Sequence, residues 1–265
     1  MEITRGFAEQ VIAAVRSCKE IMLGAFTVSE KAGASNLVTT ADTSVQEHLR
    51  GMLEKILPQA WFLGEESPEY RQDGTFWVVD PIDGTSNFVR GMRLSVVSVA
   101  LVDRGEEIFG VVYNPYSEEL FCAAKGAGAY LNGTRIHVSG RDFAHALLFT
   151  AFSLYEKKYA PACEAVLKEL YAGCDDFRRL GSAALELCYL AAGRGELYFE
   201  MRLFPWDWAA AGVIIREAGG VVGTIAGECL RHDRPVLLLA ANSVENYRKL
   251  KTTVQKYVPE LPYRF

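Results

Sequence analysis

The most informative stretch of the sequence is Trp77-Val78-Val79-Asp80-Pro81-Ile82-Asp83-Gly84-Thr85-Ser86-Asn87-Phe88. An apolar, strand-forming run leads into Asp80, and Pro81 is expected to end the strand because proline has no N–H to donate to a ladder. Asp83 follows three residues later, and Gly84 allows a tight turn. Two carboxylates at one strand end repel each other unless a hard cation such as Mg²⁺, which prefers oxygen ligands, lies between them.

The residues after the second acid suggest anion binding. If a short helix begins at this turn, the amides of Gly84 and Thr85 point outward at its N-terminus, where a phosphate is stabilised. The alternative is a turn in which Asp80 and Asp83 only accept hydrogen bonds from nearby backbone groups. The full combination of residues 80–88 is too specific to be explained by such a turn alone.

Hydrophobic periodicity predicts the elements of the first half of the chain. We expect helices over residues 6–26 and 43–56, the second with a capping box formed by Thr43 and Gln46. A mobile loop is expected from Ser29 to Asn36. Short strands are predicted at 60–63, 76–79, 94–102, 108–112 and 120–123, and Asn132-Gly133 predicts a hairpin turn.

The second half contains longer helical patterns. Helices are predicted at 155–171, 182–192 and 208–218, with Asp207 as the N-cap of the third and Gly219-Gly220 at its end. Strands are predicted at 196–199 and 236–241, and a last helix from residue 244. This mixture indicates an α+β protein of packed layers, loosely divided into an N-terminal part, residues 1–142, and a C-terminal part, residues 143–265.

Composition excludes several classes of protein. The 265 residues are half hydrophobic, and 28 Lys and Arg against 33 Asp and Glu give a net charge of −5. This acidic balance argues against direct nucleic-acid binding. No apolar run approaches the roughly 18 residues of a membrane span and no secretion signal is seen, so we expect a cytoplasmic protein without membrane contact. The six cysteines have no paired spacing and are expected to be reduced.

Several familiar catalytic patterns are missing. The sequence has no G-x-x-x-x-G-K-[ST] loop and no pair of histidines with zinc-ligand spacing, which argues against a P-loop nucleotide site and a zinc hydrolase. Gly126-x-Gly128 lacks the third glycine of a dinucleotide fingerprint. Asp42-Thr43-Ser44 resembles the D-T-[SG] of aspartic proteases, but no second copy exists to share the proton.

Residues 80–88 closely resemble the D-P-I-D-G-T-x-N-F signature of the inositol monophosphatase family, the Mg²⁺-dependent, lithium-sensitive sugar-phosphate phosphatases. Further segments resemble family motifs in the same order over nearly the whole chain: Leu37-Val38-Thr39-Thr40-Ala41-Asp42, Leu63-Gly64-Glu65-Glu66-Ser67, Gly181-Ser182-Ala183, Glu200, and Trp206-Asp207 through Gly219-Gly220. The resemblance implies a layered αβαβα sandwich with the active site between the two parts of the chain.

The resemblance also implies roles, position by position. Glu65, Asp80 and the Ile82 carbonyl would hold one Mg²⁺, Asp80, Asp83 and Asp207 would hold a second, and a third, weaker ion could bind near Glu65. Thr85, hydrogen-bonded to Asp42, would act with Glu65 to orient and deprotonate a metal-activated water for in-line attack on phosphorus. The amides of Gly84 and Thr85 would bind phosphate, and the polyol hydroxyls would meet Asp83, Ala183, Glu200 and Asp207. Lys31 aligns with a family lysine near the phosphate.

Several activities share this scaffold. Nucleotide-bisphosphate phosphatases of the superfamily show D-G-T-K-[ED]-F, whereas this chain has Ser86-Asn87 after Thr85, which favours hydrolysis of myo-inositol 1-phosphate to inositol and phosphate. Fructose 1,6-bisphosphate, histidinol phosphate and 3′-phosphoadenosine 5′-phosphate stay open as substrates. Arg202 lies where it could contact a second phosphate or only face solvent.

The resemblance bears on partners as well. It implies a homodimer. A function of another class is a partner-binding regulator on this fold, because some bacterial relatives act within transcription complexes. The intact acids at positions 65, 80, 83 and 207 favour catalysis over this alternative.

Overall fold

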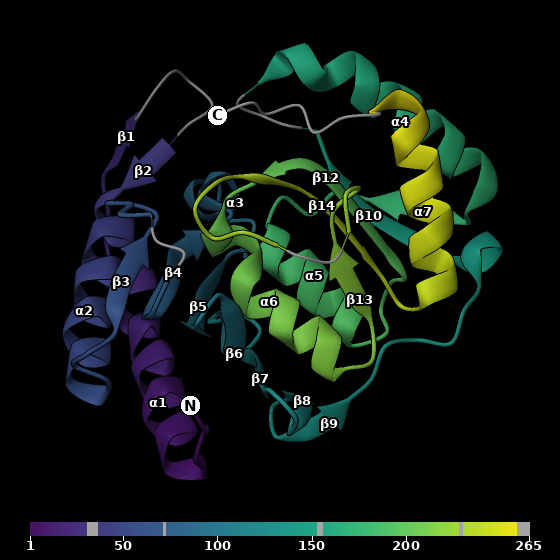
Figure 1. Cartoon of the computed structure of the whole chain (residues 1–265). Helices are drawn as coiled ribbons and strands as arrows, with labels where there is room; N and C mark the ends of the chain where they lie inside the picture. The colour runs from purple at the N-terminus through teal and green to yellow at the C-terminus, as the bar shows by residue number, and fades with distance from the viewer. Residues whose placement is uncertain (31–36, 71–72, 153–155, 228–229, 259–265) are drawn as a thin grey trace.

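The structure is a computed structural model that describes residues 1–30, 37–70, 73–152, 156–227 and 230–258. Its first layer is a pair of helices, α1 (Arg5–Met22) and α2 (Thr40–Ile56), which lie side by side in Figure 1. Helix α1 buries a stripe at helical spacing that packs on the neighbouring sheet, formed by Val11, Ala14, Val15, Cys18 and Met22. This stripe explains why the periodicity of the first residues predicts a helix.

Helix α2 begins three residues earlier than predicted. Its N-cap is Thr39, which forms a capping box with Asp42, so the prediction of a box at Thr43 and Gln46 is wrong. The reason is tertiary: β1 (Val28–Glu30) pairs with β2 (Leu37–Thr39) and holds the backbone extended as far as Thr39. Ser29 and Glu30 therefore lie in a strand and not in the expected loop, and residues 31–36 lie outside the described residues.

The second layer is a seven-stranded sheet in the order β3-β4-β5-β6-β7-β8-β9. The strands are β3 (Trp61–Gly64), β4 (Thr75–Asp83), β5 (Val96–Asp103), β6 (Glu106–Asn114), β7 (Glu119–Ala124), β8 (Gly128–Leu131) and β9 (Thr134–Ile136). Strands β8 and β9 form the hairpin predicted at Asn132-Gly133. Within this sheet, β3 and β4 pair in parallel, and the other neighbouring strands pair antiparallel.

Strand β4 continues through Pro81, so the prediction that Pro81 ends it is wrong. The pairing of β4 with β5 shifts register between Asp80 and Asp83. Such a bulge leaves one residue out of the ladder, which accommodates a proline and changes the direction of the flanking side chains. Helix α3 (Thr85–Val89) follows after Gly84.

The third layer consists of α5 (Ala183–Ala191) and α6 (Pro205–Glu217), which separate the first sheet from the second in Figure 1. Helix α6 lies so close to β6 that a Cβ on Gly110 would fall 2.4 Å from the carbonyl oxygen of Ala210. Only glycine permits this approach. Both helices are apolar on nearly every side because they are covered by a sheet on each face.

The fourth layer is a five-stranded sheet in the order β11-β10-β12-β14-β13. Its strands are β10 (Leu147–Ala151), β11 (Asp176–Arg178), β12 (Leu197–Leu203), β13 (Val221–Gly223) and β14 (Val236–Ala241). The outer layer contains α4 (Ala160–Gly173) and α7 (Val244–Tyr257). Helix α4 begins later than the predicted residue 155, after two short 3₁₀ turns in this half at Phe143–His145 and Lys157–Tyr159.

These layers confirm the α+β class and the αβαβα order. The larger sheet lies within residues 61–136 and the smaller within 147–241, but α6 of the second half packs on strands of the first, and one hydrophobic core includes residues of both. A division between residues 142 and 143 stays a prediction. All five cysteines in the described residues are free, and Cys229 lies outside them.

Candidate active site

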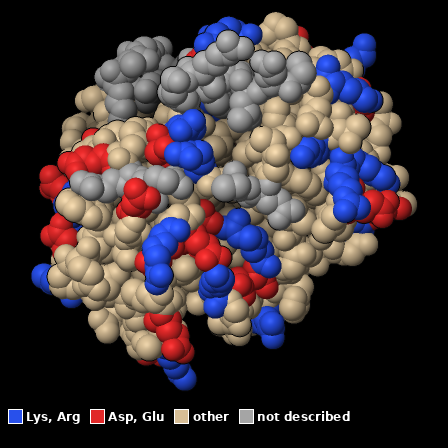
Figure 2. All heavy atoms as spheres, viewed as in Figure 1, with Lys and Arg blue, Asp and Glu red and all other residues tan. Residues whose placement is uncertain are grey.

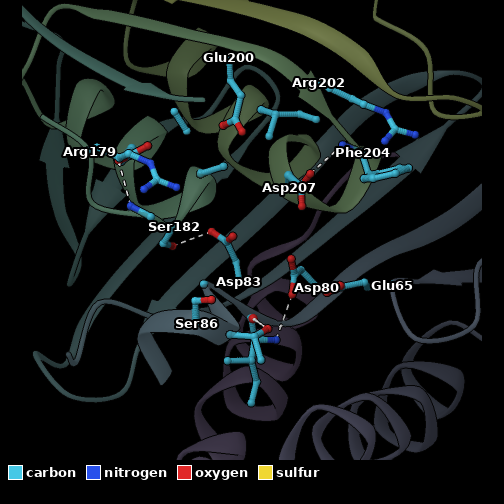
Figure 3. A pocket seen from close by; sticks show the side chains of 18 of the residues that line it. Glu65, Asp80, Asp83, Ser86, Arg179, Ser182, Glu200, Arg202, Phe204 and Asp207 are labelled. Atoms are coloured by element: carbon cyan, nitrogen blue, oxygen red, sulfur yellow. Dashed lines mark hydrogen bonds between the residues drawn. The ribbon is translucent and has the colours of Figure 1, made fainter. Parts of the chain in front are cut away.

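Three carboxylates converge between the two sheets. Carboxylate oxygens of Asp80, Asp83 and Asp207 all lie within 4.8 Å of one another, and they come from the end of β4 and the first turn of α6. Figure 3 shows the three side chains around one end of the pocket. Asp207 is far in the sequence from Asp80 and Asp83. Only the packing of α6 against the first sheet therefore creates this cluster.

Each carboxylate is oriented by one or two donors. Asp80 Oδ1 accepts a hydrogen bond from the amide of Ile82 at 3.0 Å. Asp83 Oδ2 accepts from Ser182 Oγ at 2.6 Å and from the Ala184 amide at 2.8 Å, which ties β4 to the start of α5. These bonds leave other carboxylate oxygens available for a cation.

Asp207 does not occupy the position in helix α6 that the sequence predicts. It is the third residue of α6 and not the N-cap, which is Phe204. Pro205 starts the helix at a position where proline is favoured, and Asp207 Oδ2 accepts the Phe204 amide at 2.7 Å. The sequence places an acid correctly in the first turn of the helix, but the helix begins three residues earlier than predicted, at Pro205, whose lack of an N–H costs no hydrogen bond at the first helical position.

The electrostatics of the cluster are unfavourable without a cation. Burial raises the pKa of Asp80 well above its usual value, and the charges of Glu65 and Asp83 raise it further. Burial also raises the pKa of Asp83 to about 6, against the lowering effect of its hydrogen bond from Ser182. Asp207 has a pKa raised well above its usual value, first by burial and then by Asp83. An all-oxygen donor set whose charges repel one another suits Mg²⁺.

Glu65, Thr85 and Asp42 lie beside the cluster but outside it. Glu65 lines the same pocket and does not belong to the three-carboxylate group. Thr85 Oγ1 lies 3.3 Å from Asp42 Oδ1 and 3.2 Å from the carbonyl oxygen of Ile82, so its single proton can serve only one of the two acceptors. The Thr85–Asp42 pair expected from the resemblance is present in the structure.

The turn after β4 brings backbone amides to the pocket. Gly84 has φ +86°, and a Cβ there would lie 3.0 Å from the carbonyl oxygen of Gly181, so glycine is required. Gly84, Thr85 and Ala183 all line the pocket. The amides of residues 84 and 85 lie at the start of α3, where helical amides have no partner within the helix.

Glu200 lies at the other end of the pocket from Asp80, as Figure 3 shows. Its carboxylate accepts a hydrogen bond from Tyr198 at 2.6 Å. Burial raises the pKa of Glu200 to about 7, opposed by that hydrogen bond and by the charge of Arg179. Because this pKa lies near neutral pH, both the ionised and the protonated forms of Glu200 are present there. The carboxylate accepts hydrogen bonds, and the protonated carboxyl group can also donate one.

Sequence reasoning missed Glu186. This buried acid accepts hydrogen bonds from the amides of Leu180 and Gly181 and so fixes the segment that leads to Ser182. The one available signal was a single acid inside the otherwise apolar run of α5. The role of Ser182 as a donor to Asp83 was also missed, although the residue belongs to a quoted motif.

Other expectations can be placed on the structure. Lys31 lies outside the described residues. Arg202 does not simply face solvent: its guanidinium lies 3.0 Å from Glu156 and stacks over the ring of Phe204. On the face shown in Figure 2, Lys and Arg atoms are interspersed with Asp and Glu atoms in the described part of the chain. No helix among the described residues is long and apolar enough to cross a membrane.

The chain belongs to the inositol monophosphatase family, whose model matches residues 3–262. It is 41% identical over 198 residues to a Nus factor SuhB of Vibrio cholerae serotype O1, covering 74% of each chain. It is similar in structure to the extragenic suppressor protein suhB of Bartonella henselae, with a TM-score of 0.86, 31% identity and coverage of 95% and 99%. An IMPase of Thermotoga maritima gives a TM-score of 0.84, 30% identity and coverage of 96% and 98%.

The raised pKa values predict a pH-dependent stability. Because the folded protein without cation binds these protons more tightly than the unfolded chain, its stability falls as pH rises from about 4 through 7. We expect the Tm without cation to be lower at pH 7.5 than at pH 5. Mg²⁺ at about 100 times its Kd should raise the Tm at pH 7.5 by about 5–10 °C. Calorimetry with NaCl of equal ionic strength is the control, and equal shifts with both salts would contradict a specific site.

Proposed function

We propose that this chain is a Mg²⁺-dependent phosphomonoesterase that hydrolyses myo-inositol 1-phosphate to inositol and phosphate. The observation that carries the proposal is the cluster of Asp80, Asp83 and Asp207 in one pocket with the Gly84 turn and Glu200. Mg²⁺ bound by these carboxylates, with Glu65 and the Ile82 carbonyl, would neutralise phosphate charge and lower the pKa of water. Two to three ions per site are proposed by family resemblance.

The residues of the chain then have separate tasks. The amides of Gly84 and Thr85 bind the phosphate oxygens. When Thr85 donates its proton to Asp42, the lone pairs of its oxygen face the pocket and accept a hydrogen bond from the attacking water. Glu65, which lines the same pocket, assists in taking the proton of that water.

The polyol is proposed to lie between the cluster and Glu200. Asp83, Glu200, Asp207 and the backbone of Ala183 are positioned around this space and can accept or donate hydrogen bonds to several hydroxyl groups. Ser86 and Asn87 take the place of the K-[ED] pair of nucleotide-bisphosphate phosphatases. Asn87 is used structurally, because its Nδ2 donates to the carbonyls of Leu94 and Leu180.

A phosphate-release panel tests the substrate. We expect the highest kcat/KM with myo-inositol 1-phosphate among four substrates, the others being fructose 1,6-bisphosphate, histidinol phosphate and 3′-phosphoadenosine 5′-phosphate. Each is measured with Mg²⁺ and with Mg²⁺ removed by chelation, and release should require the cation. A clear preference for one of the other three would replace the proposed substrate, and release that survives chelation would refute the metal dependence.

The name of the curated relatives favours one second candidate, a regulatory, partner-binding role. Such a role would be independent of turnover, so a catalytically inactive variant should retain it. A homodimer and a cytoplasmic location stay predictions; light scattering of the purified protein tests the first. We also propose that residues 1–142 supply most metal ligands and that residues 143–265 supply Asp207 and the polyol contacts.

A further inference from the structure

Two arginines line the otherwise acidic pocket, Arg179 and Arg202. Figure 3 shows them on opposite sides of Glu200, with Arg179 toward Asp83 and Ser182 and Arg202 toward Phe204. Neither side chain lies among the three clustered carboxylates. Both flank Glu200, at the end of the pocket where the polyol of the proposed substrate would extend.

The two guanidinium groups are not equivalent. Arg202 already has an anionic partner, Glu156 at 3.0 Å, and is held over the ring of Phe204. For Arg179, no hydrogen bond or ion pair is found among the described residues. It acts on the pocket through its charge, which lowers the pKa of Glu200. Of the two arginines, Arg179 is therefore the one whose guanidinium group is available to bind an incoming anion.

The backbone that follows Arg179 is held by hydrogen bonds to its amides and to a carbonyl group. The Leu180 and Gly181 amides donate to the buried carboxylate of Glu186, and the Leu180 carbonyl accepts Asn87 Nδ2 at 2.7 Å. One residue further, Ser182 is bonded to Asp83 of the cluster. These bonds hold the backbone next to Arg179 in place relative to the clustered carboxylates, so this backbone need not be ordered when the guanidinium binds a ligand.

We propose that Arg179 forms a second anion-binding position in the pocket, which takes a second phosphate on a polyol whose first phosphate lies over the carboxylate cluster. A guanidinium suits this task, because its planar donors match phosphate oxygens in pairs. The inference rests on the proposed function and deepens it: polyol bisphosphates would be bound through both ends. Arg179 acts here in specificity and takes no part in bond cleavage.

Fructose 1,6-bisphosphate and fructose 1-phosphate form a matched pair for the test, because they share the 1-phosphate and differ in the second phosphate. We expect the native chain to have a higher kcat/KM for the bisphosphate. In Arg179→Gln, the ratio of the two kcat/KM values should fall about 10- to 100-fold, the range for loss of a charged hydrogen bond. Arg179→Lys should restore part of the ratio.

Arg178→Gln is the matched control, since Arg178 is the adjacent residue and pairs with Asp176 in β11. Its ratio should stay at the native value. An unchanged ratio in Arg179→Gln would overturn the inference, as would an equal loss on both substrates, which would mean that Arg179 only balances the charge of Glu200. A larger loss of the ratio in Arg202→Gln would assign the second phosphate to Arg202 instead.

Binding separates this inference from the proposed function. Calorimetric titration of both sugars with Mg²⁺ present, into Thr85→Ala and into the same arginine variants combined with Thr85→Ala, gives the ratio from Kd values while turnover is slowed about 10²-fold or more. If the native chain releases no phosphate but binds the bisphosphate more tightly in an Arg179-dependent way, the proposed function fails and the inference stands. Equal binding of the two sugars by Thr85→Ala would overturn the inference.

Discussion

Asp80→Asn should lower the Mg²⁺-dependent kcat/KM about 10³-fold or more, because it removes the charge proposed to bridge two cations, an interaction of several kcal/mol. The fold should persist. Asparagine has nearly the same shape, and its Oδ1 can still accept the hydrogen bond that the Ile82 amide donates at 3.0 Å. Steady-state phosphate release and thermal denaturation of the same preparation measure the two quantities.

The stability of this variant gives an independent check. In the chain without cation, Asp80 is buried and repelled by Glu65, Asp83 and Asp207, so replacing its charge should raise the Tm at pH 7.5 or leave it unchanged. The Tm increase with Mg²⁺ should become smaller. Asp175→Asn, an exposed acid before β11, is the control and should leave both properties at native values. Native activity in Asp80→Asn would refute the bridging assignment.

Thr85→Ala should lower kcat about 10²-fold or more, the usual scale for a group that assists proton transfer, with a much smaller change in KM. The physical reason is that the hydroxyl lies within 3.3 Å of Asp42 and within 3.2 Å of the Ile82 carbonyl, where it can orient a water without contacting the polyol. Full kcat and KM measurements with the preferred substrate separate the two effects.

Thr85→Ser is the matched variant for this test. Serine keeps the hydroxyl and loses only a methyl group, so most of the kcat should return. If Thr85→Ala raises KM while kcat is retained, Thr85 is a binding residue. If Thr85→Ser is as impaired as Thr85→Ala, the methyl group and the packing around it matter more than the proton.

Much of the candidate site could be predicted from local sequence, because its parts lie at the ends of strongly patterned segments. The apolar run before Asp80, the glycine at 84 and the acid at the start of a helix at 207 each specify a local geometry. The boundaries were less predictable. Thr39 and Thr43 both precede a suitable side chain by three residues, and only the pairing of β1 with β2 selects Thr39 as the cap.

By itself, the sequence determined the class of the fold, the family and the identity of the clustered acids, because strand and helix periods and a signature of nine residues are local properties. The tertiary structure alone brought Asp207 to Asp80 and Asp83, through the close contact of α6 with the first sheet at Gly110. It also paired Arg202 with Glu156 and left Arg179 beside Glu200. These pairings depend on contacts between segments that are distant in the sequence. The sequence shows that a residue is charged, but it does not show which residue the packing will bring beside it.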